Sequence, residues 1–412
     1  EFGVFFSPNK GDRWKELGNG LPTIAVRDIA IQKRENDLVL GTFGRGFYVM
    51  DDYSALRNIE NSDISTKAEI FPIRNALMWE KALPLGLPGK AFQGDQFYSA
   101  DNLDPVAIVS YYYSDSYKSI KDKRQKKEKE QIKSEEDAPY PSYDDLYAEV
   151  NEEKPSLIFT IKNASGKVVK KEFRKPSKGL QRFHWNLRYE ENSPISLSSP
   201  SFYNPFAGAS EGTLVNPGVY TVELDLYDMG SISNLVSPVS FNVEALDNTV
   251  MPAEDRAAKV AFQREVSKLQ GEMSASGRIL SEISNKLKYI KEAVKVVEEP
   301  IGPLSKTIRD IESKVKDINT RLYGDSVKRR LDIQQLTSPS SRLGSMAYEQ
   351  KYSTAAPTLT HVRSFEIAKE EYMPIKEEIE NLMKADIKAL EDKLKDIGAP
   401  YTPGRIMEEQ QF

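Results

Sequence analysis

The sequence predicts a multidomain chain in which a β-rich part precedes a purely helical part. Short apolar runs separated by Gly, Asn and Pro turns fill the chain up to residue 245, which is typical of strands. Past Pro252 the apolar residues recur in alternating steps of three and four, which is typical of helices. We expect these divisions: a β unit at 1–52, a connector at 53–103, a β-sandwich at 104–246 with a charged insertion at 116–154, and a helical domain at 252–412.

Composition excludes several classes of function. The formal net charge of -5, with both signs mixed, gives no sustained positive field, so we expect no nucleic-acid partner. Cysteine is absent, which excludes disulfides, thiolate metal sites and cysteine nucleophiles. No window approaches the roughly 18 consecutive apolar residues of a membrane span. The first six residues lack the features of a signal peptide, so we expect any export signal to lie upstream.

The first fifty residues are predicted to form short antiparallel strands joined by tight turns. The expected strands are Phe2–Phe6, Trp14–Leu17, Ala25–Ile31, Leu38–Thr42 and Phe47–Met50. They amount to about one four-stranded sheet, which would leave edges and an apolar face exposed if it stood alone. We therefore expect neighbouring strands from sequence outside this chain or from another chain.

The first turn carries a recognisable motif. Residues 7–14 read Ser-Pro-Asn-Lys-Gly-Asp-Arg-Trp, and they match the Asp-box (BNR) pattern S-x-[DN]-x-G-x-x-W. This motif resembles the hairpins of sialidase-like and sortilin-like β-propellers. Ser7 and Asn9 are expected to bond turn backbone groups, Gly11 to permit a positive φ, and Trp14 to pack between blades. These roles are structural, and we expect no catalytic residue among them.

A second motif extends the resemblance. Residues 26–31 and 38–52, which include the turn Gly44-Arg45-Gly46, resemble the last blade of large BNR-repeat proteins of Bacteroidota-type bacteria with a sortilin-like propeller. Such proteins are often labelled glycosyl hydrolases. The resemblance continues along the chain and implies a secreted, periplasmic or outer-membrane-surface location. We expect the Gly-Arg-Gly turn to be structural, because it lacks the Lys-Ser/Thr ending of a phosphate loop.

The middle region has its own strand pattern. After a helix-like stretch at 54–59, an extended connector is expected at 70–96, and the strands are expected at 105–113, 157–161, 168–173, 181–188, 218–227 and 236–243. Residues 179–188 and 216–222 resemble an FlgD-like Ig or fibronectin-III-like sandwich, which implies that Trp185 and Tyr220 lie in its core. The loop 192–213 is the expected contact surface, and the charged run 118–137 is expected to be a solvated helix or a disordered insertion.

The helical domain is predicted from two apolar seams and a third long helix. The first seam is Phe262, Val266, Leu269, Met273, Leu280, Ile283, Leu287, Ile290, Val294 and Val297, with Ser276 in the gap. The second seam is Leu304, Ile308, Ile311, Val315, Ile318 and Leu322. The third helix spans 358–397 with a kink at Pro374, and 336–357 is expected to be mainly loop. We expect an antiparallel three-helix coiled-coil bundle, or a two-helix coil with the third helix packed across it.

No catalytic constellation is apparent in this chain. The two histidines, His184 and His361, fall in different predicted domains, so neither a triad nor a histidine-rich metal site is expected. His184 should be an exposed strand residue, and His361 should have a surface or capping role. Sialidase chemistry needs arginines, a Tyr/Glu pair and an Asp from several blades, which one blade does not supply. We expect no cofactor and no metal.

The leading functional hypothesis is a non-catalytic scaffold or binding subunit of an exported propeller protein, for protein or glycan recognition. One alternative is the structural C-terminal part of a glycan or peptide hydrolase whose active site lies on blades outside this chain. A second alternative is a sortilin-like peptide receptor. The expected partner is the missing N-terminal propeller portion, held non-covalently if the backbone is cut, or another envelope protein.

Overall fold

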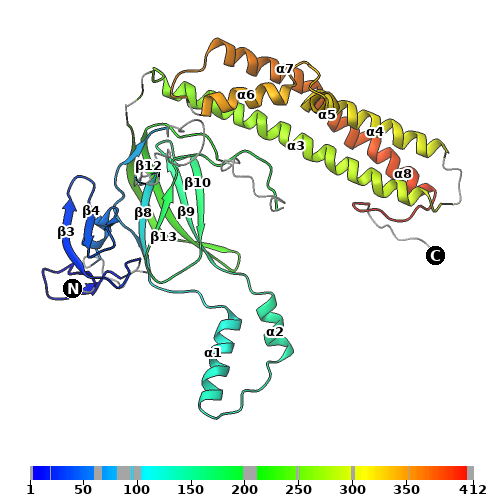
Figure 1. Ribbon diagram of the computed structural model, residues 1–412. Helices are drawn as coiled ribbons and strands as arrows, with labels where there is room; N and C mark the ends of the chain where they lie inside the picture. Colours follow the sequence, from blue (N-terminus) through cyan, green and yellow to red (C-terminus); the bar gives the residue numbers. More distant parts are fainter. Residues whose placement is uncertain are drawn as a thin grey trace. The chain divides into compact units, whose positions relative to one another are not determined.

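The computed structural model shows a mixed β and α protein with several sheets (Figure 1). It describes residues 3–18, 20–59, 67–80, 94, 96, 104–197, 211–246, 249, 251–297, 302–351 and 353–405. The chain divides into two compact units. The first is made of residues 1–79, 99–189 and 215–248, and the second of residues 80–98, 190–214 and 249–412.

The first unit begins with two small sheets. β1 (Phe5–Phe6) and β2 (Lys15–Glu16) form a two-stranded hairpin. β3 (Val26–Gln32), β4 (Asp37–Thr42) and β5 (Phe47–Met50) form a three-stranded antiparallel sheet in that order. The 3-10 helix η1 (Tyr53–Arg57) follows directly. The strands thus occur where the apolar runs predict them, but they are divided between two sheets.

Two larger sheets make up the rest of the strands of this unit. One has the order β10-β9-β12-β13-β7 and the other the order β11-β8-β6. Their bounds are β6 Ala68–Ile70, β7 Ala76–Met78, β8 Ala107–Tyr113, β9 Ser156–Asn163, β10 Val168–Arg174, β11 Gly179–Trp185, β12 Gly218–Asp228 and β13 Ser231–Ala245. All neighbouring strands are antiparallel except β13 and β7, which are parallel.

The expectation of an extended connector over 70–96 is wrong for its first part. β7 lies within this stretch and pairs with β13, and β6 ends at Ile70, where the stretch begins, and pairs with β8, so each strand lies at the edge of one large sheet. Proline between them, at Pro72, ends the first strand, because it has no N–H to donate. The short lengths of β6 and β7 hid them from a search for alternating runs. Most of the remaining connector lies outside the described residues.

Aromatic side chains join the two large sheets. Phe159 of β9 contacts Tyr111 of β8 and Phe183 of β11, with ring centroids 4.6 and 4.7 Å apart. Trp185 of β11 contacts Tyr220 of β12 at 5.3 Å. Because each pair joins one sheet to the other, the core of this unit lies between the sheets. Trp185 is fully buried and Tyr220 nearly so.

A helical hairpin interrupts the strands between β8 and β9. It consists of α1 (Ile120–Lys133) and α2 (Tyr143–Val150), and neither helix contains a buried residue. The charged run at 118–137 was expected to be a solvated helix or a disordered insertion, and the structure shows the solvated helix. The hairpin stands clear of the sheets of its own unit (Figure 1).

Three long helical runs of the second unit share one apolar core. The elements are α3 (Arg256–Val294), α4 (Gly302–Tyr323), α7 (Leu359–Asn381), the π-helical turn η3 (Leu382–Ile387) and α8 (Lys388–Asp396). Lys291 of α3 bonds Glu312 of α4 at 2.7 Å, while Tyr323 bonds the Met273 carbonyl at 3.0 Å, so α4 is antiparallel to α3. Nearly every residue of the two predicted seams is buried.

One expectation about this unit is corrected. Residues 336–357 are not mainly loop, because α6 (Pro339–Lys351) lies within them and buries Leu343 and Met346. Ser338 and Pro339 are start signals for this helix: the Ser338 hydroxyl accepts from the Ser341 N–H, and proline suits the first helical position. α7 contains Pro374 in its interior, as the sequence predicts for the third helix, and a second irregularity that was not predicted, the π-helical turn η3, begins eight residues later. The short α5 (Ser326–Arg330) was not predicted.

In the described part of the chain, no helix combines the length and apolarity needed to cross a membrane.

Candidate interaction surface

The Asp-box turn is held by local hydrogen bonds, as its sequence predicts. The Ser7 hydroxyl accepts from the Gly11 N–H at 2.7 Å and donates to the Asn9 Oδ1 at 3.0 Å. The same Asn9 oxygen accepts from the Arg13 N–H at 2.8 Å. Gly11 has a φ of +107°, which favours glycine. The turn that links β1 to β2 is therefore held by hydrogen bonds between residues of the turn itself.

Trp14 is the member of the Asp-box that the chain leaves uncovered. Its side chain is 64 % exposed, although the sequence pattern implies that it packs between blades. A tryptophan side chain is usually covered by other residues, because burying its large apolar surface is strongly favourable. The expected covering strands are not among the described residues of this chain.

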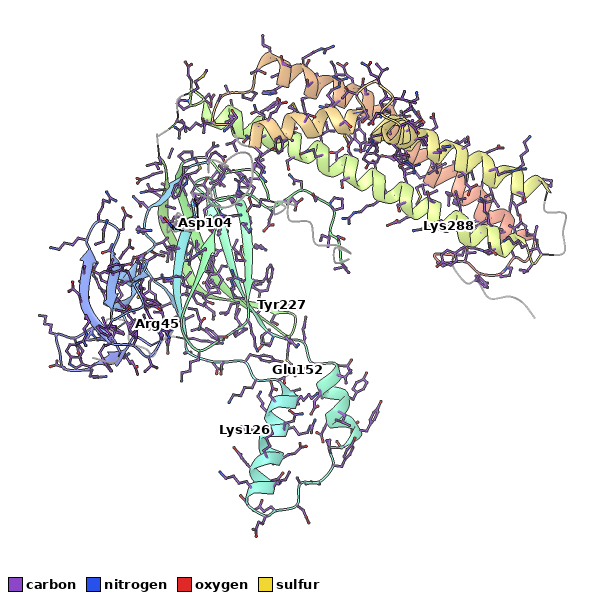
Figure 2. The ribbon with its side chains drawn as sticks, in the orientation of Figure 1. Arg45, Asp104, Lys126, Glu152, Tyr227 and Lys288 are labelled. Atoms are coloured by element: carbon purple, nitrogen blue, oxygen red, sulfur yellow. The ribbon has the colours of Figure 1, made fainter. Side chains whose placement is uncertain are left out.

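The Gly44-Arg45-Gly46 turn connects β4 to β5. Both glycines have positive φ, +84° and +69°, and the Thr42 N–H donates to the Gly46 carbonyl at 3.0 Å. Arg45 is exposed at the tip (Figure 2). The neighbouring Phe43 is exposed too, and its ring lies 5.4 Å from the guanidinium of Arg27. The turn reverses the chain, and its apolar neighbour Phe43 faces solvent.

Both faces of the β3-β4-β5 sheet carry exposed apolar side chains. Register pairs Ile29 with Leu40 and Leu40 with Tyr48, so these side chains share one face. On the other face Val39 pairs with Val49, and Gly41 with Phe47. The exposed members are Ile29 and Ile31 on the first face, and Val49 and Phe47 on the second, where Phe47 is 81 % exposed. Apolar residues on both faces are typical of strands covered on both sides.

A half-buried arginine joins the residues that follow β5 to the larger sheets of the same unit. Arg182 of β11 donates from Nη1 to the Asp51 carbonyl and from Nη2 to the Asp52 carbonyl, both at 2.6 Å, and from Nε to the Ser110 hydroxyl at 3.2 Å. Burial lowers the pKa of Arg182, and the nearby Asp52 and Asp51 carboxylates oppose that shift. A second link joins Arg74 Nη1 to the Glu35 carbonyl at 2.8 Å.

The acidic pair Asp51-Asp52 therefore has a structural role. Asp52 is buried with a φ of +44°, and its carboxylate accepts from the Ser54 N–H at 3.2 Å to begin η1. Its own N–H donates to the Asp37 carboxylate at 3.0 Å. Among the described residues, no three His, Asp or Glu side chains converge as a metal ion would require.

The core residues predicted from the sequence lie together. Trp185 Nε1 donates to the Arg188 carbonyl at 3.0 Å, and the Tyr220 hydroxyl donates to the Asn216 carbonyl at 2.7 Å. Burial raises the pKa of Tyr220 above its ordinary value. Both polar groups are thus satisfied inside an apolar environment, which lets these large side chains be buried.

The two histidines have the structural positions expected of them. His184 is exposed on β11. His361 completes a capping box: its N–H donates to the Thr358 hydroxyl, and its Nδ1 accepts from the Thr358 N–H, each at 3.2 Å. His361 Nε2 also lies 2.9 Å from a carboxylate oxygen of Glu349.

The loop expected to be a contact surface, 192–213, belongs to the second unit in its described parts. The Asn192 amide donates to the Ser267 hydroxyl of α3 at 3.0 Å, and Arg278 donates to the Ile195 carbonyl. The Asn192 carbonyl lies so near Gly271 that a Cβ there would be 2.2 Å from it. A cavity of about 380 Å³ lies beside this contact, lined in part by Glu191, Ser193, Ser274 and Tyr323. Residues 198–210 lie outside the described part.

No protein-family model and no curated protein matches the sequence of this chain.

The sequence signal that was missed is the apolar content of both faces of the first three-stranded sheet. The alternation predicted that one face of the first sheet needs cover, but the register shows that both faces do. A continuous apolar content along β3, β4 and β5 could have indicated this, since two-sided burial removes the polar positions. The Arg182 contacts could not be found in that way, because the bonded residues are 130 or more positions apart.

Proposed function

We propose that residues 1–52 are a terminal blade of a β-propeller, similar to those of BNR-repeat proteins, and that its neighbouring blades lie outside this chain. The observation that carries the proposal is the exposed apolar surface on both faces of the β3-β4-β5 sheet. A blade inside a propeller packs against a neighbour on each face, so both of its faces are apolar. Exposed Trp14 on the Asp-box hairpin supports the same reading.

The two large sheets would form an Ig-like or fibronectin-III-like sandwich attached to this blade. Trp185 in its core and the Tyr220 hydroxyl bond to the Asn216 backbone support this assignment, because the second contact is similar to the tyrosine corner of such sandwiches. The seams of α3 and α4 would pack as an antiparallel coiled coil, since their buried residues keep the alternating three-and-four spacing.

In function, the protein would be a non-catalytic scaffold or binding subunit that completes a propeller and presents it for protein or glycan recognition. Several polar side chains of the blade and its junction have structural partners: Ser7 and Asn9 bond their own turn, and Arg182 bonds the Asp51 and Asp52 carbonyls just after β5. We place the protein outside the cell or at its envelope on the resemblance of the Asp-box motif. The recognition surface would be built jointly with the other blades.

The experiment is native and then denaturing mass analysis of the protein purified from its source, together with acrylamide quenching of Trp14 fluorescence. Additional propeller sequence should accompany this chain, either in the same polypeptide or as a fragment released only on denaturation. Trp14 should be shielded in that protein and freely quenched in the isolated 412-residue chain. A source protein that runs as this chain alone, with Trp14 equally open to quencher, would overturn the proposal.

A variant of the isolated chain gives an independent reading. Phe47→Ser with Val49→Thr removes apolar surface from one face of the sheet, and neither side chain supports the core of this chain. The folding stability of the isolated chain should therefore change little. Association with the remaining blades, supplied as a separate polypeptide, should weaken by at least about tenfold, because two apolar anchors of the contact are lost.

A further inference from the structure

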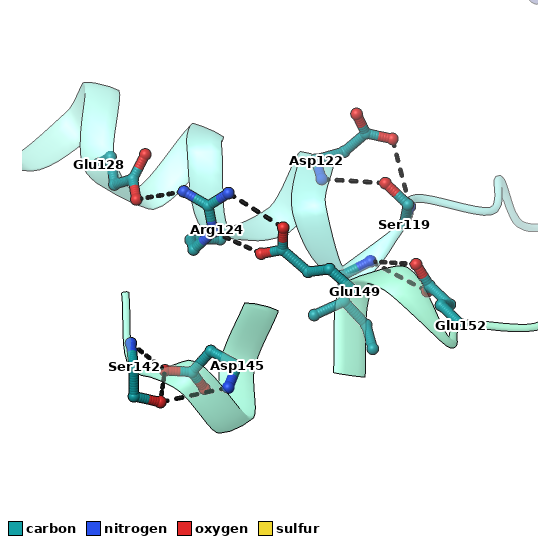
Figure 3. A network of polar contacts seen from close by, with 9 residues as sticks. Ser119, Asp122, Arg124, Glu128, Ser142, Asp145, Glu149 and Glu152 are labelled. Carbon is teal, nitrogen blue, oxygen red and sulfur yellow. Dashed lines mark hydrogen bonds and ion pairs between the residues drawn. The ribbon is translucent and has the colours of Figure 1, made fainter. Parts of the chain in front are cut away.

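The α1–α2 hairpin forms two capped helices although neither helix contains a buried residue. Each helix begins with a complete capping box: Ser119 with Asp122, and Ser142 with Asp145 (Figure 3). Both the hydroxyl and the carboxylate of each pair bond a backbone N–H, which satisfies groups that the first helical turn leaves free. An eight-residue helix such as α2 is marginal by itself, so these caps stabilise it directly.

Charged side chains hold the two helices together. Arg124 of α1 donates to both carboxylate oxygens of Glu149 of α2, with Nη2 at 3.0 Å, and also to Glu128 at 2.6 Å (Figure 3). The Glu149 side chain is only 6 % exposed. At the base of the hairpin, the Glu152 carboxylate accepts from the Ile120 N–H at 2.9 Å. Polar contacts therefore hold the hairpin together, and its apolar side chains are not needed to join the two helices.

Those apolar residues form an exposed stripe. Tyr143, Tyr147 and Val150 are spaced at i, i+4 and i+7, which places them along one side of α2. Their exposed fractions are 77, 59 and 85 %, and the Tyr143 and Tyr147 rings stack at 5.9 Å. Tyr140 in the preceding loop and Ile132 near the end of α1 are exposed as well. Exposed tyrosines that lie together on one helix side are typical of protein contact sites.

The two halves of the hairpin carry opposite charge. α1 has seven Lys or Arg and three acidic residues, and the segment 134–153 has eight acidic residues and no Lys or Arg. Figure 2 labels Lys126 on the basic helix and Glu152 beside the acidic one. The basic helix α1 therefore complements in charge the acidic segment 134–153 that carries the tyrosines.

We propose that the α1–α2 hairpin is a dimerisation element whose occupant is the hairpin of a second copy of this chain. In a two-fold arrangement, α1 of each copy lies antiparallel against α2 of the other, so the lysines of one copy meet the acidic residues of its partner twice. The tyrosine stripes lie between them, where lysine stems and ammonium groups also favour aromatic rings. Such a contact does not depend on the proposed propeller.

The expected affinity is modest. Three tyrosines of roughly 150–250 Å² each would bury on the order of 500 Å² per copy with their aliphatic neighbours. This is below the roughly 800 Å² per partner of a standard stable interface. We therefore expect a dimer that forms at micromolar concentration and weakens as salt screens its charges.

Charge exchange between the two halves gives the decisive test, read by sedimentation velocity on the full chain. One variant reverses the basic half (Lys123→Glu, Lys126→Glu and Lys127→Glu), and the other reverses the acidic half (Glu136→Lys, Asp137→Lys and Asp144→Lys). None of these side chains takes part in the capping boxes or the Arg124 contacts. Each variant alone should be monomeric, and an equimolar mixture should dimerise, because both contacts become attractive again. Lys288→Glu on α3 is the control and should dimerise like the unaltered chain.

The tyrosine stripe is tested separately. Tyr143→Ala with Tyr147→Ala should raise the dimer Kd by at least about tenfold at both low and high salt, since the loss is apolar. Tyr289→Ala, an exposed tyrosine of α3, should leave the Kd unchanged. An unaltered chain that stays monomeric up to about 100 µM, or a mixture of charge variants that fails to associate, would overturn the proposal and leave a foreign basic protein as the partner.

Discussion

The guanidinium of Arg182 and the carbonyl of Asp52 lie 2.6 Å apart, and this contact joins β11 to the end of the small β3-β4-β5 sheet. The residues are 130 positions apart in sequence. The same guanidinium bonds the Asp51 carbonyl, so one side chain satisfies two consecutive backbone acceptors. The geometry matches the fixed fork of arginine donors, which lysine does not offer.

Replacing Arg182 should therefore destabilise the first unit. Arg182→Ala leaves two carbonyls without a donor, and Arg182→Lys can satisfy one of them at most. We expect the free energy of unfolding to fall by about 3 kcal/mol for the alanine variant and by less for the lysine variant. Urea denaturation measures both. Lys171→Ala, at an exposed position of β10, should lie within about 0.5 kcal/mol of the unaltered chain. Equal losses for Arg182→Ala and Lys171→Ala would contradict the linking role.

Two polar residues of the Asp-box turn, Asn9 and Asp12, should differ in their effect on the stability of the β1–β2 hairpin. Asn9→Ala removes the acceptor for the Ser7 hydroxyl and the Arg13 N–H, so the β1–β2 hairpin should lose about 1 kcal/mol of local stability. The Asp12 side chain forms no comparable bond in the described structure, so Asp12→Ala should have little effect. Hydrogen exchange of the Gly11 and Arg13 amides measures the difference. Equal exchange in both variants would mean that the turn is not held by Asn9.

Two helical glycines make a matched pair. At Gly271 an added Cβ would lie 2.2 Å from the Asn192 carbonyl oxygen, whereas at Gly344 it would meet nothing within 4 Å. Gly271→Ala should therefore displace residues 190–197 from α3 and speed their hydrogen exchange. Gly344→Ala should stabilise α6 by about 0.5–1 kcal/mol, because alanine has the higher helix propensity. Unchanged hydrogen exchange of residues 190–197 in Gly271→Ala would contradict the packing of the Asn192 carbonyl against Gly271.

A buried hydroxyl pair in the helical unit should show coupling. The Ser276 and Tyr372 hydroxyls lie 2.8 Å apart, and both residues are almost fully buried. Ser276→Ala or Tyr372→Phe alone leaves one hydroxyl without its partner and should cost about 1–2 kcal/mol. The double variant should cost less than the sum of the two, and a double-mutant cycle of thermal or urea unfolding measures the difference. Strict additivity would show that the hydroxyls do not interact.

Buried tyrosines predict a loss of stability at alkaline pH. Burial raises the pKa of Tyr111, Tyr220 and Tyr372 in the folded state, relative to an ordinary value of 10.0. Above about pH 10 the unfolded chain therefore loses these protons first and binds fewer protons than the folded chain, so the free energy of unfolding must decrease. The stabilisation is fully present below pH 10 and is lost as pH rises.

Urea denaturation from about pH 8 to about pH 11 measures this dependence. Tyr220→Phe removes one of the shifted groups and should make the decrease shallower. Tyrosine absorbance should show these residues titrating later in the folded than in the unfolded protein. A stability that is constant across this range, or that rises with pH, would contradict the assignment.

Much of the architecture could be predicted from local pattern. The steps of three and four from Phe262 to Leu322 predict α3 and α4 and their buried residues, because helical periodicity places those side chains on one side. The Asp-box turn is equally local, since Ser7, Asn9 and Gly11 bond only within the turn. The prediction of loop at 336–357 was wrong because it relied on the Ser and Gly content of α6. It did not take into account the helix start signal at Ser338-Pro339.

By itself, then, the sequence determined the helix faces, most strand positions, the Asp-box turn and the core positions of Trp185 and Tyr220. Only the tertiary structure decided that Arg182 bonds the two residues after β5, that β6 and β7 join different sheets, and that Asn192 packs on Gly271. The physical reason is range. Periodicity and turn chemistry act over a few residues, whereas these contacts join residues that are distant in sequence and meet only when the sheets and helices have packed.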